Sequence, residues 1–409
     1  MKYVIIGNSA AGVSAVEGIR SADAAGEIVV ISEERFPVYG RPLISYYLLG
    51  ATDRSRMNYR PEDFYEKMGV RLMLGERAER IDVSAKEVVL KSGARVGYDK
   101  LLVATGSRPF DPPMEGLGEV KQKFHFMSMQ DALDLEKALS VRKRALIVGA
   151  GLIGLKCLEG ILGRVKSVTV VNMAGRILPS ILDDAGAAIV QRELEAKGVR
   201  FCLSDSVKKF EAGTAHLAGG GSIPFDLLVV AVGVRPNVEL VREAGGEVAR
   251  GIVTDDHLRT SLPDVFAAGD CTESDDVSSG TRKILALLPN ATQQGFAAGV
   301  NMAGGDSAFG SAIPLNAIGF FGSHVLTAGS YTGESYTEAE GDRYRRFFVQ
   351  DGVLKGFILV NAPERAGIYT SLVRNRTPLS GLDTARLEAA PVLAAFPASV
   401  REAMLSREV

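Results

Sequence analysis

The sequence has few cysteines, no long apolar run and almost no net charge. Its three cysteines, Cys157, Cys202 and Cys271, lie far apart and form no Cys-x-x-Cys pair. Neither a disulfide framework nor a zinc site is therefore indicated, and we expect no metal. Because no stretch of 18 apolar residues occurs, we expect no transmembrane helix and no membrane binding. The formal net charge of −2 gives no electrostatic reason to expect nucleic-acid binding. The cytoplasm is the default location.

Glycine, by contrast, is abundant, with 45 of the 409 residues and no Gly-X-Y period. Such a content favours tight turns and a backbone that closely approaches a bound ligand. The hydrophobic content of 46% and the charged content of 23% are ordinary for a globular protein. The length exceeds that of one ordinary hydrophobic core, which predicts two or three domains.

The chain contains an internal repeat. A strand, a glycine-rich turn and a helix at 3–19 recur at 145–162. Each copy is followed by an apolar strand that starts after an aspartate, Asp99 or Asp226, and ends in a short glycine motif at 104–106 or 231–233. The repeat predicts two related units of βαβ type in an α/β fold, that is, two Rossmann-like dinucleotide-binding domains.

Other segments extend this organisation. Short β-branched runs at 27–32 and 168–171 predict buried parallel strands, and 184–197 predicts an amphipathic helix ended by Gly198. From about Ile313 the pattern changes to a hairpin, 345–349 and 353–360, joined by Asp351-Gly352. We expect a small α+β C-terminal domain here, with the last ~28 residues helical and partly exposed.

The first glycine motif is Gly7-Asn8-Ser9-Ala10-Ala11-Gly12, in which a serine replaces the middle glycine of G-x-G-x-x-G. Gly7 permits the tight turn, Gly12 permits close packing of helix and strand, and the helix N-terminus favours a pyrophosphate. A plain strand-to-helix turn is the alternative. Glu33 favours the nucleotide hypothesis because a carboxylate 21 residues past Gly12 can accept both ribose hydroxyls, with Glu34 as the second choice.

The second motif, Gly149-Ala150-Gly151-Leu152-Ile153-Gly154, is complete and lies between a strand and a helix. At the end of the partner strand stands Asn172 instead of an acid. Its amide can bond a ribose 2′-hydroxyl, though without the strength of a carboxylate. Arg176, four residues later, is the kind of residue that a 2′-phosphate requires. We favour NADH and leave NADPH open.

A third motif runs from Thr260 to Asp270, where an apolar strand ends in Ala-Ala-Gly-Asp. Asp270 is either a turn residue or an acceptor for a flavin ribityl hydroxyl. With the other two motifs in this order, the sequence resembles the FAD-dependent pyridine nucleotide–disulfide oxidoreductase superfamily over about residues 1–312. Arg41-Pro42-Leu43-Ile44-Ser45 and the segment 316–322 resemble the branch of NADH:rubredoxin oxidoreductases, nitrite reductase flavin domains and NAD(P)H oxidases.

The resemblance implies three domains: an FAD-binding domain of 1–112 and 245–312, an NAD(P)H-binding domain of 113–244, and a C-terminal interface domain of 313–409. It implies a site for FAD and a site for NADH or NADPH. The FAD residues would be Gly7, Ser9, Ala11, Gly12, Glu33, Arg41, Pro42, Thr105, Gly106, Asp270, Pro289, Asn290 and Ala291. The nicotinamide nucleotide residues would be Gly149, Gly151, Leu152, Ile153, Gly154, Asn172 and Gly233.

Three departures from the family pattern bear on the chemistry. The segment 39–49 contains no cysteine, which excludes relayed thiol chemistry there, and Cys157 and Cys271 are expected to be buried apolar residues. Tyr46 and Lys156 stand where many relatives carry Lys and Glu, a pair near flavin N5. Lys156 then needs a new partner or solvent. We expect Arg41, Ser45 and Lys156 at the reacting end of the site, with Lys156 contacting flavin or nicotinamide.

The resemblance implies a hydride from NAD(P)H to FAD, followed by electrons to an acceptor. The first hypothesis for the acceptor is rubredoxin, a ferredoxin-like protein or another small redox protein. The alternatives are an oxidase that reduces O₂, a slow flavoprotein redox sensor, and a degenerate nicotinamide site fed by a protein donor. By analogy with the family, the C-terminal domain can form a homodimer. The basic segment 343–346 is either a solvated strand face or a docking patch for an acidic partner.

Overall fold

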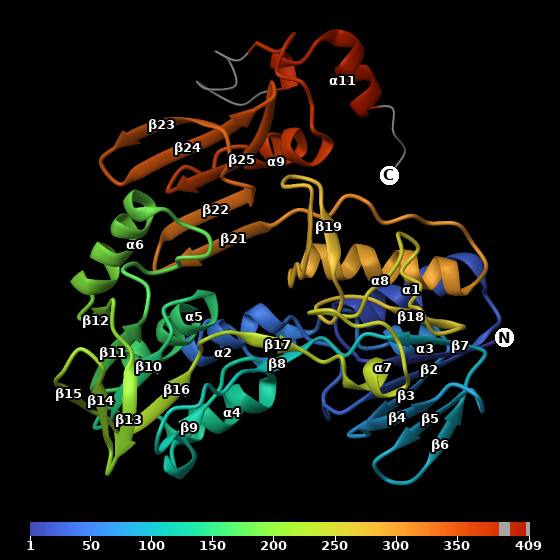
Figure 1. Ribbon diagram of the computed structural model, residues 1–409, viewed down its shortest axis with the longest axis horizontal. Coiled ribbons are helices and arrows are strands. Elements are labelled where there is room, and N and C mark those ends of the chain that lie inside the picture. The colour runs from blue at the N-terminus through green and yellow to red at the C-terminus, as the bar shows by residue number, and fades with distance from the viewer. Residues whose placement is uncertain (384–392, 406–409) are drawn as a thin grey trace. The chain divides into compact units, whose positions relative to one another are not determined.

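The computed structural model describes residues 1–383 and 393–405 (Figure 1). By its contacts the chain forms two compact units. Unit 1 consists of Met1–Ile177, Glu195–Ser274 and Arg282–Gly310, and unit 2 of Leu178–Leu194, Asp275–Thr281 and Ser311–Val409. The division into three domains inferred from the sequence is finer than this and remains a prediction.

The first half of unit 1 has a five-stranded parallel sheet in the order β18-β7-β1-β2-β3. Because β1 and β2 are buried on both faces, their sequences are almost continuously apolar. An antiparallel sheet of β4, β5 and β6 packs on one face. The strands are β1 (Lys2–Ile6), β2 (Glu27–Ser32), β3 (Val70–Leu74), β4 (Ala78–Asp82), β5 (Glu87–Leu90), β6 (Arg95–Gly97), β7 (Lys100–Val103) and β18 (Val265–Ala267).

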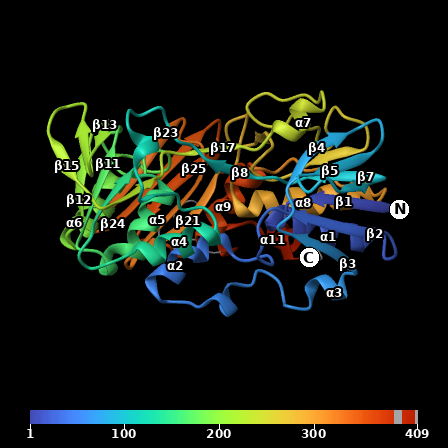
Figure 2. The same cartoon turned by 90° about the horizontal axis from the view of Figure 1, so that it is seen from below.

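Helices α1 (Ala10–Ala22) and α8 (Leu288–Met302) cover the other face of that sheet and lie side by side (Figure 2). Glycines let their backbones meet. A Cβ on Gly295 would lie 2.1 Å from the carbonyl oxygen of Ala11, and one on Gly299 would lie 2.2 Å from that of Ala15. The two helices therefore pack backbone to backbone, which fixes the start of each one relative to the other.

The second half of unit 1 repeats this plan, with a parallel sheet in the order β12-β11-β10-β16-β9 and an antiparallel sheet of β13, β14 and β15 on one face. The strands are β9 (Lys123–Phe124), β10 (Arg144–Val148), β11 (Ser167–Asn172), β12 (Arg200–Leu203), β13 (Val207–Glu211), β14 (Thr214–Leu217), β15 (Ser222–Pro224) and β16 (Leu227–Val230). Its helices include α4 (Met129–Ala138) and α5 (Leu152–Ile161). The predicted α/β class with two Rossmann-like halves is thus confirmed.

The two halves repeat individual backbone hydrogen bonds as well. In each half, the amide of the first motif glycine donates to a carbonyl oxygen of the neighbouring strand. The side-chain carboxylate of the aspartate just before β7 or β16 accepts a hydrogen bond from the amide of the first residue of β1 or β10. The pairs are Gly7–Ile31 (2.9 Å) and Lys2–Asp99 (2.6 Å) in the first half, and Gly149–Val171 (2.8 Å) and Arg144–Asp226 (2.7 Å) in the second. The repeat seen in the sequence is therefore a repeat of local geometry.

Short elements join and flank the halves of unit 1. Strands β8 (Ser107–Pro109) and β17 (Val234–Pro236), which directly follow the two short glycine motifs, pair with each other antiparallel. Helix α2 (Ile44–Leu49) packs on α5, where a Cβ on Gly160 would lie 3.1 Å from the carbonyl oxygen of Ser45. Helices α3 (Phe64–Lys67) and α7 (Glu239–Glu243) are short. A second two-stranded sheet pairs β19 (Ser274–Asp276) with β20 (Thr281–Lys283), and its residues 275–281 are counted in unit 2.

Unit 2 is built on a five-stranded antiparallel sheet in the order β21-β22-β25-β24-β23. The strands are β21 (Leu315–Phe320), β22 (Ser323–Gly329), β23 (Glu334–Glu340), β24 (Arg343–Gln350) and β25 (Val353–Val360). Helix α9 (Ala366–Asn375) packs on the sheet through Tyr369, which contacts the rings of Phe347 and Phe357. The predicted hairpin is confirmed, with positive φ at Asp351 (53°) and Gly352 (69°).

Helix α6 (Asp184–Ala196) confirms the helix predicted at 184–197, and most of it is counted in unit 2. It is preceded by Asp183, which accepts hydrogen bonds from Tyr344 (2.5 Å) and Arg346 (2.8 Å) of β24. In the basic segment, Arg343 also pairs with Glu364 (2.9 Å) and Arg345 with Glu338. These intramolecular partners favour the solvated strand face over a docking patch.

The C-terminal segment is described only in part. It contains a 3₁₀ turn at Leu393–Ala395 and α11 (Ala398–Leu405), while 384–392 and 406–409, part of the predicted helical tail, lie outside the described residues. Within the described part of the chain, no helix has the length and apolar character needed to span a bilayer.

Candidate functional site

The first glycine motif forms a tight turn between β1 and α1. Gly7 has φ +122°, and a Cβ there would lie 2.1 Å from the carbonyl oxygen of Ala104. A Cβ on Gly12 would lie 2.0 Å from the carbonyl oxygen of Gly7. Both positions therefore require glycine because of the protein's own backbone. Ser9 is the extended residue before α1, and Ala11 lies in the helix's first turn.

The second motif repeats this geometry between β10 and α5. Gly149 has φ +109° and would place a Cβ 2.3 Å from the carbonyl oxygen of Ala231, and Gly154 would place one 2.0 Å from Gly149. Gly151 differs, because its φ of −83° suits any residue and nothing lies within 4 Å of its Cβ position. The protein interior gives no reason for glycine there, whereas a pyrophosphate close to the backbone does.

Helices α1, α5 and α8 begin without a side-chain cap, at Ser9, Gly151 and Leu287, as do the short helices α2, α3 and α7 and the helix α9. Helix α4, by contrast, begins with a full capping box between Ser128 and Asp131. Uncapped helix starts leave amides that a phosphate or a flavin edge can occupy. Leu152 and Ile153 lie in the first turn of α5, and Pro289, Asn290 and Ala291 in that of α8.

A half-buried carboxylate, that of Asp270, lies shortly after the end of β18. Asp270 follows Gly269, whose amide donates to Gln294 Oε1 of α8 (2.6 Å). Burial raises the pKa of the Asp270 carboxyl, although the charge of Arg41 and a hydrogen bond with Ser107 act in the opposite direction. In the same half, Asn8 Nδ2 is buried with no hydrogen-bond partner. A polar cofactor such as FAD would supply partners for both groups, so these residues fit it.

The two acids after β2 have different environments. Glu33 is 68% exposed and pairs with Arg77 at 3.3 Å, so its carboxylate remains accessible to a ribose. Glu34 accepts a hydrogen bond from the Tyr39 hydroxyl (2.7 Å) and forms an ion pair with Arg41. The geometry therefore favours Glu33 over Glu34 as the ribose ligand, and Glu33's role stays a prediction.

Arg41 connects several parts of unit 1. Besides Glu34, its guanidinium donates to Ser9 Oγ (3.3 Å) and to the carbonyl oxygen of Met127 (3.0 Å). Burial alone would lower the pKa of Arg41, but Tyr39 and Glu34 raise it above its usual value. A permanent cation therefore lies beside the first glycine turn, where the pyrophosphate of FAD would bind.

The remaining predicted residues near the flavin lie on short elements. Pro42 is in the 3₁₀ turn Arg41–Leu43, and Ser45, in α2, donates its hydroxyl to the Pro42 carbonyl (3.1 Å). Thr105 donates to the carbonyl oxygen of Asn237 (2.7 Å). Gly106 and Gly233 have positive φ, 63° and 122°, with open space at their Cβ positions. The structure thus places Thr105, Gly106 and Gly233 directly after the segments that contact the two glycine turns, and Pro42 and Ser45 beside Arg41 and α5, but it does not test their roles.

Lys156 has partners within unit 1 on its own helix and on α2. It forms an ion pair with Glu159, one turn later on α5, and its Nζ lies 4.5 Å from the ring centroid of Tyr46 on α2. Lys156, which replaces the glutamate of many relatives, therefore has the new partner that its charge requires. Glu159 was missed in the sequence, although its i,i+3 spacing from Lys156 is a recognisable signal for a helical ion pair. No comparable spacing in the sequence indicated that Glu34 would bond with Tyr39 and Arg41.

The side-chain amide of Asn172 forms its hydrogen bonds with nearby backbone groups. Its Oδ1 accepts the amide of Ala150 (3.1 Å), and its Nδ2 donates to the carbonyl oxygens of Ala174 (3.2 Å) and Arg176 (3.1 Å). The side chain thus ties the second glycine turn to the segment after β11. This arrangement disfavours the predicted ribose contact, which no observation tests directly. The next residue, Met173, is 80% exposed.

The cysteines are not placed for thiol chemistry. Cys157 and Cys271 are buried, as predicted, and Cys202 is half-buried. Burial raises the pKa of both buried thiols, that of Cys271 to about 11. Neither buried residue is a thiolate at neutral pH, which agrees with the absence of a cysteine beside Arg41.

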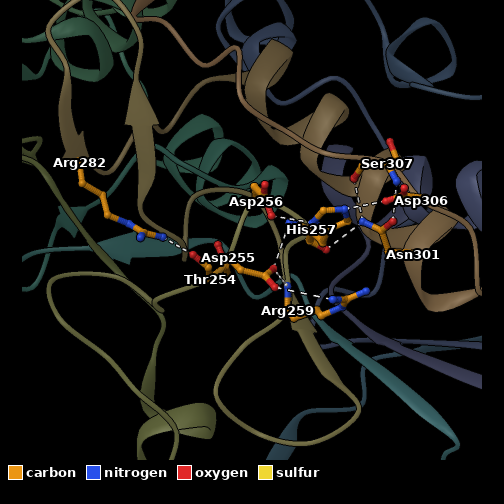
Figure 3. Close-up of polar contacts among 9 residues, drawn as sticks. All are labelled: Thr254, Asp255, Asp256, His257, Arg259, Arg282, Asn301, Asp306 and Ser307. Atoms are coloured by element: carbon orange, nitrogen blue, oxygen red, sulfur yellow. Dashed lines mark hydrogen bonds and ion pairs between the residues drawn. The ribbon is translucent and has the colours of Figure 1, made fainter.

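One group of three metal-ligating side chains occurs among the described residues: Asp255, Asp256 and His257. Figure 3 shows that they belong to a polar junction. His257 bonds Asp256 (2.6 Å) and Asp306 (2.7 Å), and its carbonyl oxygen accepts from Asn301 of α8 (2.9 Å). The contacts give this cluster a structural function in holding the loop after α8.

Comparisons with known proteins agree with this geometry. The family model described as "Pyridine nucleotide-disulphide oxidoreductase" matches residues 1–295. The chain is 32% identical over 395 residues to the NADH-dependent phenylglyoxylate dehydrogenase subunit epsilon of Aromatoleum evansii, which covers 93% of both chains. It is 33% identical over 300 residues to rubredoxin-NAD(+) reductase of Pseudomonas putida, covering 72% of this chain and 78% of that one.

A solved structure extends the likeness over the whole fold. A NAD-dependent persulfide reductase from A. fulgidus matches with a TM-score of 0.86 and 26% identity, covering 99% of this chain and 83% of that one. The two glycine turns, the half-buried Asp270 and these matches agree with one another. The chain therefore belongs to the pyridine nucleotide–disulphide oxidoreductase family and is an oxidoreductase that uses FAD and a nicotinamide nucleotide.

Proposed function

We propose that this protein is an NADH:acceptor oxidoreductase whose acceptor is a small iron–sulfur protein of the rubredoxin or ferredoxin kind. FAD accepts two electrons as a hydride from NADH and can release them singly, which suits a one-electron acceptor. The relative from Pseudomonas putida, named a rubredoxin reductase, supports this acceptor class.

One observation carries the proposal. Two equivalent nucleotide turns lie in one compact unit, and the segment between Tyr39 and Leu49 has no cysteine. With Cys157 and Cys271 buried and protonated, no thiol is available to relay electrons at this site. Electrons must then pass from the flavin to the acceptor directly, as in reductases of redox proteins and not as in disulfide reductases.

The other proposed roles, binding the two nucleotides and stabilising charge on the flavin, belong to residues of the chain. The amides at the starts of α1 and α5 would bind the two pyrophosphates, and Arg41 would add a cation at the first. With FAD bound, Asp270 would accept a hydrogen bond from a ribityl hydroxyl, and the positive dipole end at the start of α8 would stabilise negative charge on the flavin. These roles rest on the glycine turns, on the starts of α1, α5 and α8, and on the charges of Arg41 and Asp270 described above.

NADH is the proposed nucleotide. Exposed Met173 follows Asn172 at the end of β11, and an apolar side chain offers nothing to a 2′-phosphate. The relative from Aromatoleum evansii, named NADH-dependent, supports the same choice. NADH is a coenzyme of the cytoplasm, so we also propose a cytoplasmic location. A homodimer through residues 313–409 is proposed only by family analogy.

Anaerobic stopped-flow tests the acceptor. Enzyme reduced with one equivalent of NADH is mixed with oxidised rubredoxin, with a [2Fe–2S] ferredoxin, or with air-saturated buffer. We expect reoxidation by an iron–sulfur protein at least about 10-fold faster than by O₂. Faster reoxidation by O₂ would identify an oxidase. A persistent long-wavelength band of reduced flavin with NAD⁺, with slow reoxidation by every acceptor, would identify a redox sensor.

A further inference from the structure

A shielded ion pair lies on α5, the helix that packs against α2. Lys156 is two residues past Gly154, the last glycine of the second turn, and is 17% exposed in its side chain, while its partner Glu159 is 7% exposed. Removing two charges from water is costly, and such pairs contribute little to net stability. The Lys156–Glu159 pair at this position therefore indicates a function other than stabilising the fold.

The ammonium of Lys156 also lies on an aromatic ring of the other half. Tyr46 belongs to α2 and directly follows Ser45, and the distance from Nζ to the ring centroid is 4.5 Å. A cation over a partly desolvated ring gains about 0.5–2 kcal/mol. Lys156 thus connects the nicotinamide-side helix α5 with the flavin-side helix α2 by a direct contact.

Two further contacts hold the same helices together. A Cβ on Gly160 would lie 3.0 Å from the Cβ of Leu48, so α5 and α2 approach closely at that point. Arg164, just after α5, donates to the carbonyl oxygen of Leu48 (2.8 Å). These contacts lie at the end of α5, whereas Lys156 and Tyr46 make the contact nearer to the glycine turn.

We propose that Lys156 is a positioning residue: through Tyr46 it fixes the start of α5, and with it the nicotinamide turn, at a set distance from the flavin segment 41–45, while Glu159 orients its ammonium. This inference rests on the proposed function. Hydride transfer depends steeply on the separation of the reacting atoms, so a small shift of α5 lowers the rate. Because Glu159 neutralises Lys156, the pair acts through geometry and adds no net charge beside the flavin.

The test uses the full-length FAD-loaded protein and a double variant, Lys156→Met with Glu159→Gln, which removes the pair without leaving a buried charge. Three quantities are measured: NAD⁺ affinity by calorimetry, flavin reduction rate at saturating NADH, and melting temperature. We expect the rate to fall at least about 10-fold, as positioning effects do. NAD⁺ affinity should change less than about 3-fold, because the turn itself binds the nucleotide.

Conservative and control variants sharpen the result. Lys156→Arg keeps a cation over Tyr46 and should recover most of the rate. Lys137→Met removes the exposed pair with Asp134 (3.0 Å), which has the same i,i+3 spacing on α4, and should match the wild type.

The proposal is overturned if the double variant reduces its flavin at the wild-type rate, whether or not its melting temperature falls, or if NAD⁺ affinity falls more than the rate. A wild-type flavin that NADH does not reduce would instead refute the proposed function.

Discussion

Gly151 has backbone angles that any residue can adopt, and the protein leaves the space at its Cβ position empty. It can therefore be changed without strain in the free protein. Gly154, three residues on, cannot, because its Cβ would lie 2.0 Å from the carbonyl oxygen of Gly149. Gly151 is therefore explained by ligand binding, whereas Gly154 is explained by the packing of the fold.

We predict that Gly151→Ala lowers NAD⁺ affinity at least about 10-fold, since a methyl group would occupy the space of the pyrophosphate. The free energy of unfolding should change by less than about 0.5 kcal/mol. Calorimetric titration with NAD⁺ and urea unfolding measure the two effects. Gly154→Ala is the comparison and should lose stability. Unchanged affinity in Gly151→Ala would contradict the placement of the nucleotide on this turn.

Asn172 provides a second prediction at this scale. Its amide donates to two carbonyl oxygens, so Asn172→Asp would place a carboxylate against the oxygens of Ala174 and Arg176. We expect a loss of about 1–3 kcal/mol in unfolding free energy, the cost of placing a charge against two half-buried acceptors that lose their donor. NADH affinity should fall or stay the same. A variant that is as stable as the wild type and binds NADH more tightly would show that residue 172 faces the ribose.

At the scale of elements, the contact between α1 and α8 depends on glycines that helices otherwise disfavour. We predict that Gly299→Ala destabilises the protein by about 1–3 kcal/mol, because its Cβ would overlap the carbonyl oxygen of Ala15. Gly367, in α9, has open space at its Cβ position. Gly367→Ala should therefore stabilise by up to about 1 kcal/mol, from helix propensity alone. Thermal or urea unfolding of the two variants should move in opposite directions, and equal shifts would contradict the packing.

The contacts of His257 with the loop after α8 should contribute less to the stability of the protein at alkaline pH. Hydrogen bonds to Asp256 and then Asp306 raise the pKa of His257 in the folded protein. Its contribution to stability is therefore complete below the unfolded pKa of about 6.5 and is lost as pH rises through the higher folded value. The melting-temperature difference between wild type and His257→Asn should be larger at pH 6 than at pH 9. A difference that grows with pH would contradict the ion pairs in Figure 3.

Across the whole molecule, the two Rossmann-like halves could be predicted because their turns constrain the backbone. Gly7 and Gly149 need positive φ, and Gly12 and Gly154 need the absence of a side chain, so the spacing is visible in the sequence. The pairing of Lys156 with Tyr46, and the use of Asn172 within its own loop, depend on which side chains the fold brings together. The resemblance had placed Tyr46 and Lys156 at the two positions of a family pair, but no local pattern encodes the contact of the ammonium with the ring or the hydrogen bonds of Asn172.

The central claim is that the first turn binds FAD and the second binds the NADH that reduces it. The most direct measurement is the visible spectrum of the purified protein, reconstituted with FAD, before and after one equivalent of NADH under anaerobic conditions. We predict a yellow protein with about one FAD per chain whose flavin absorbance bleaches within seconds. A protein that remains colourless in the presence of FAD, or a bound flavin that NADH leaves oxidised, would contradict the claim.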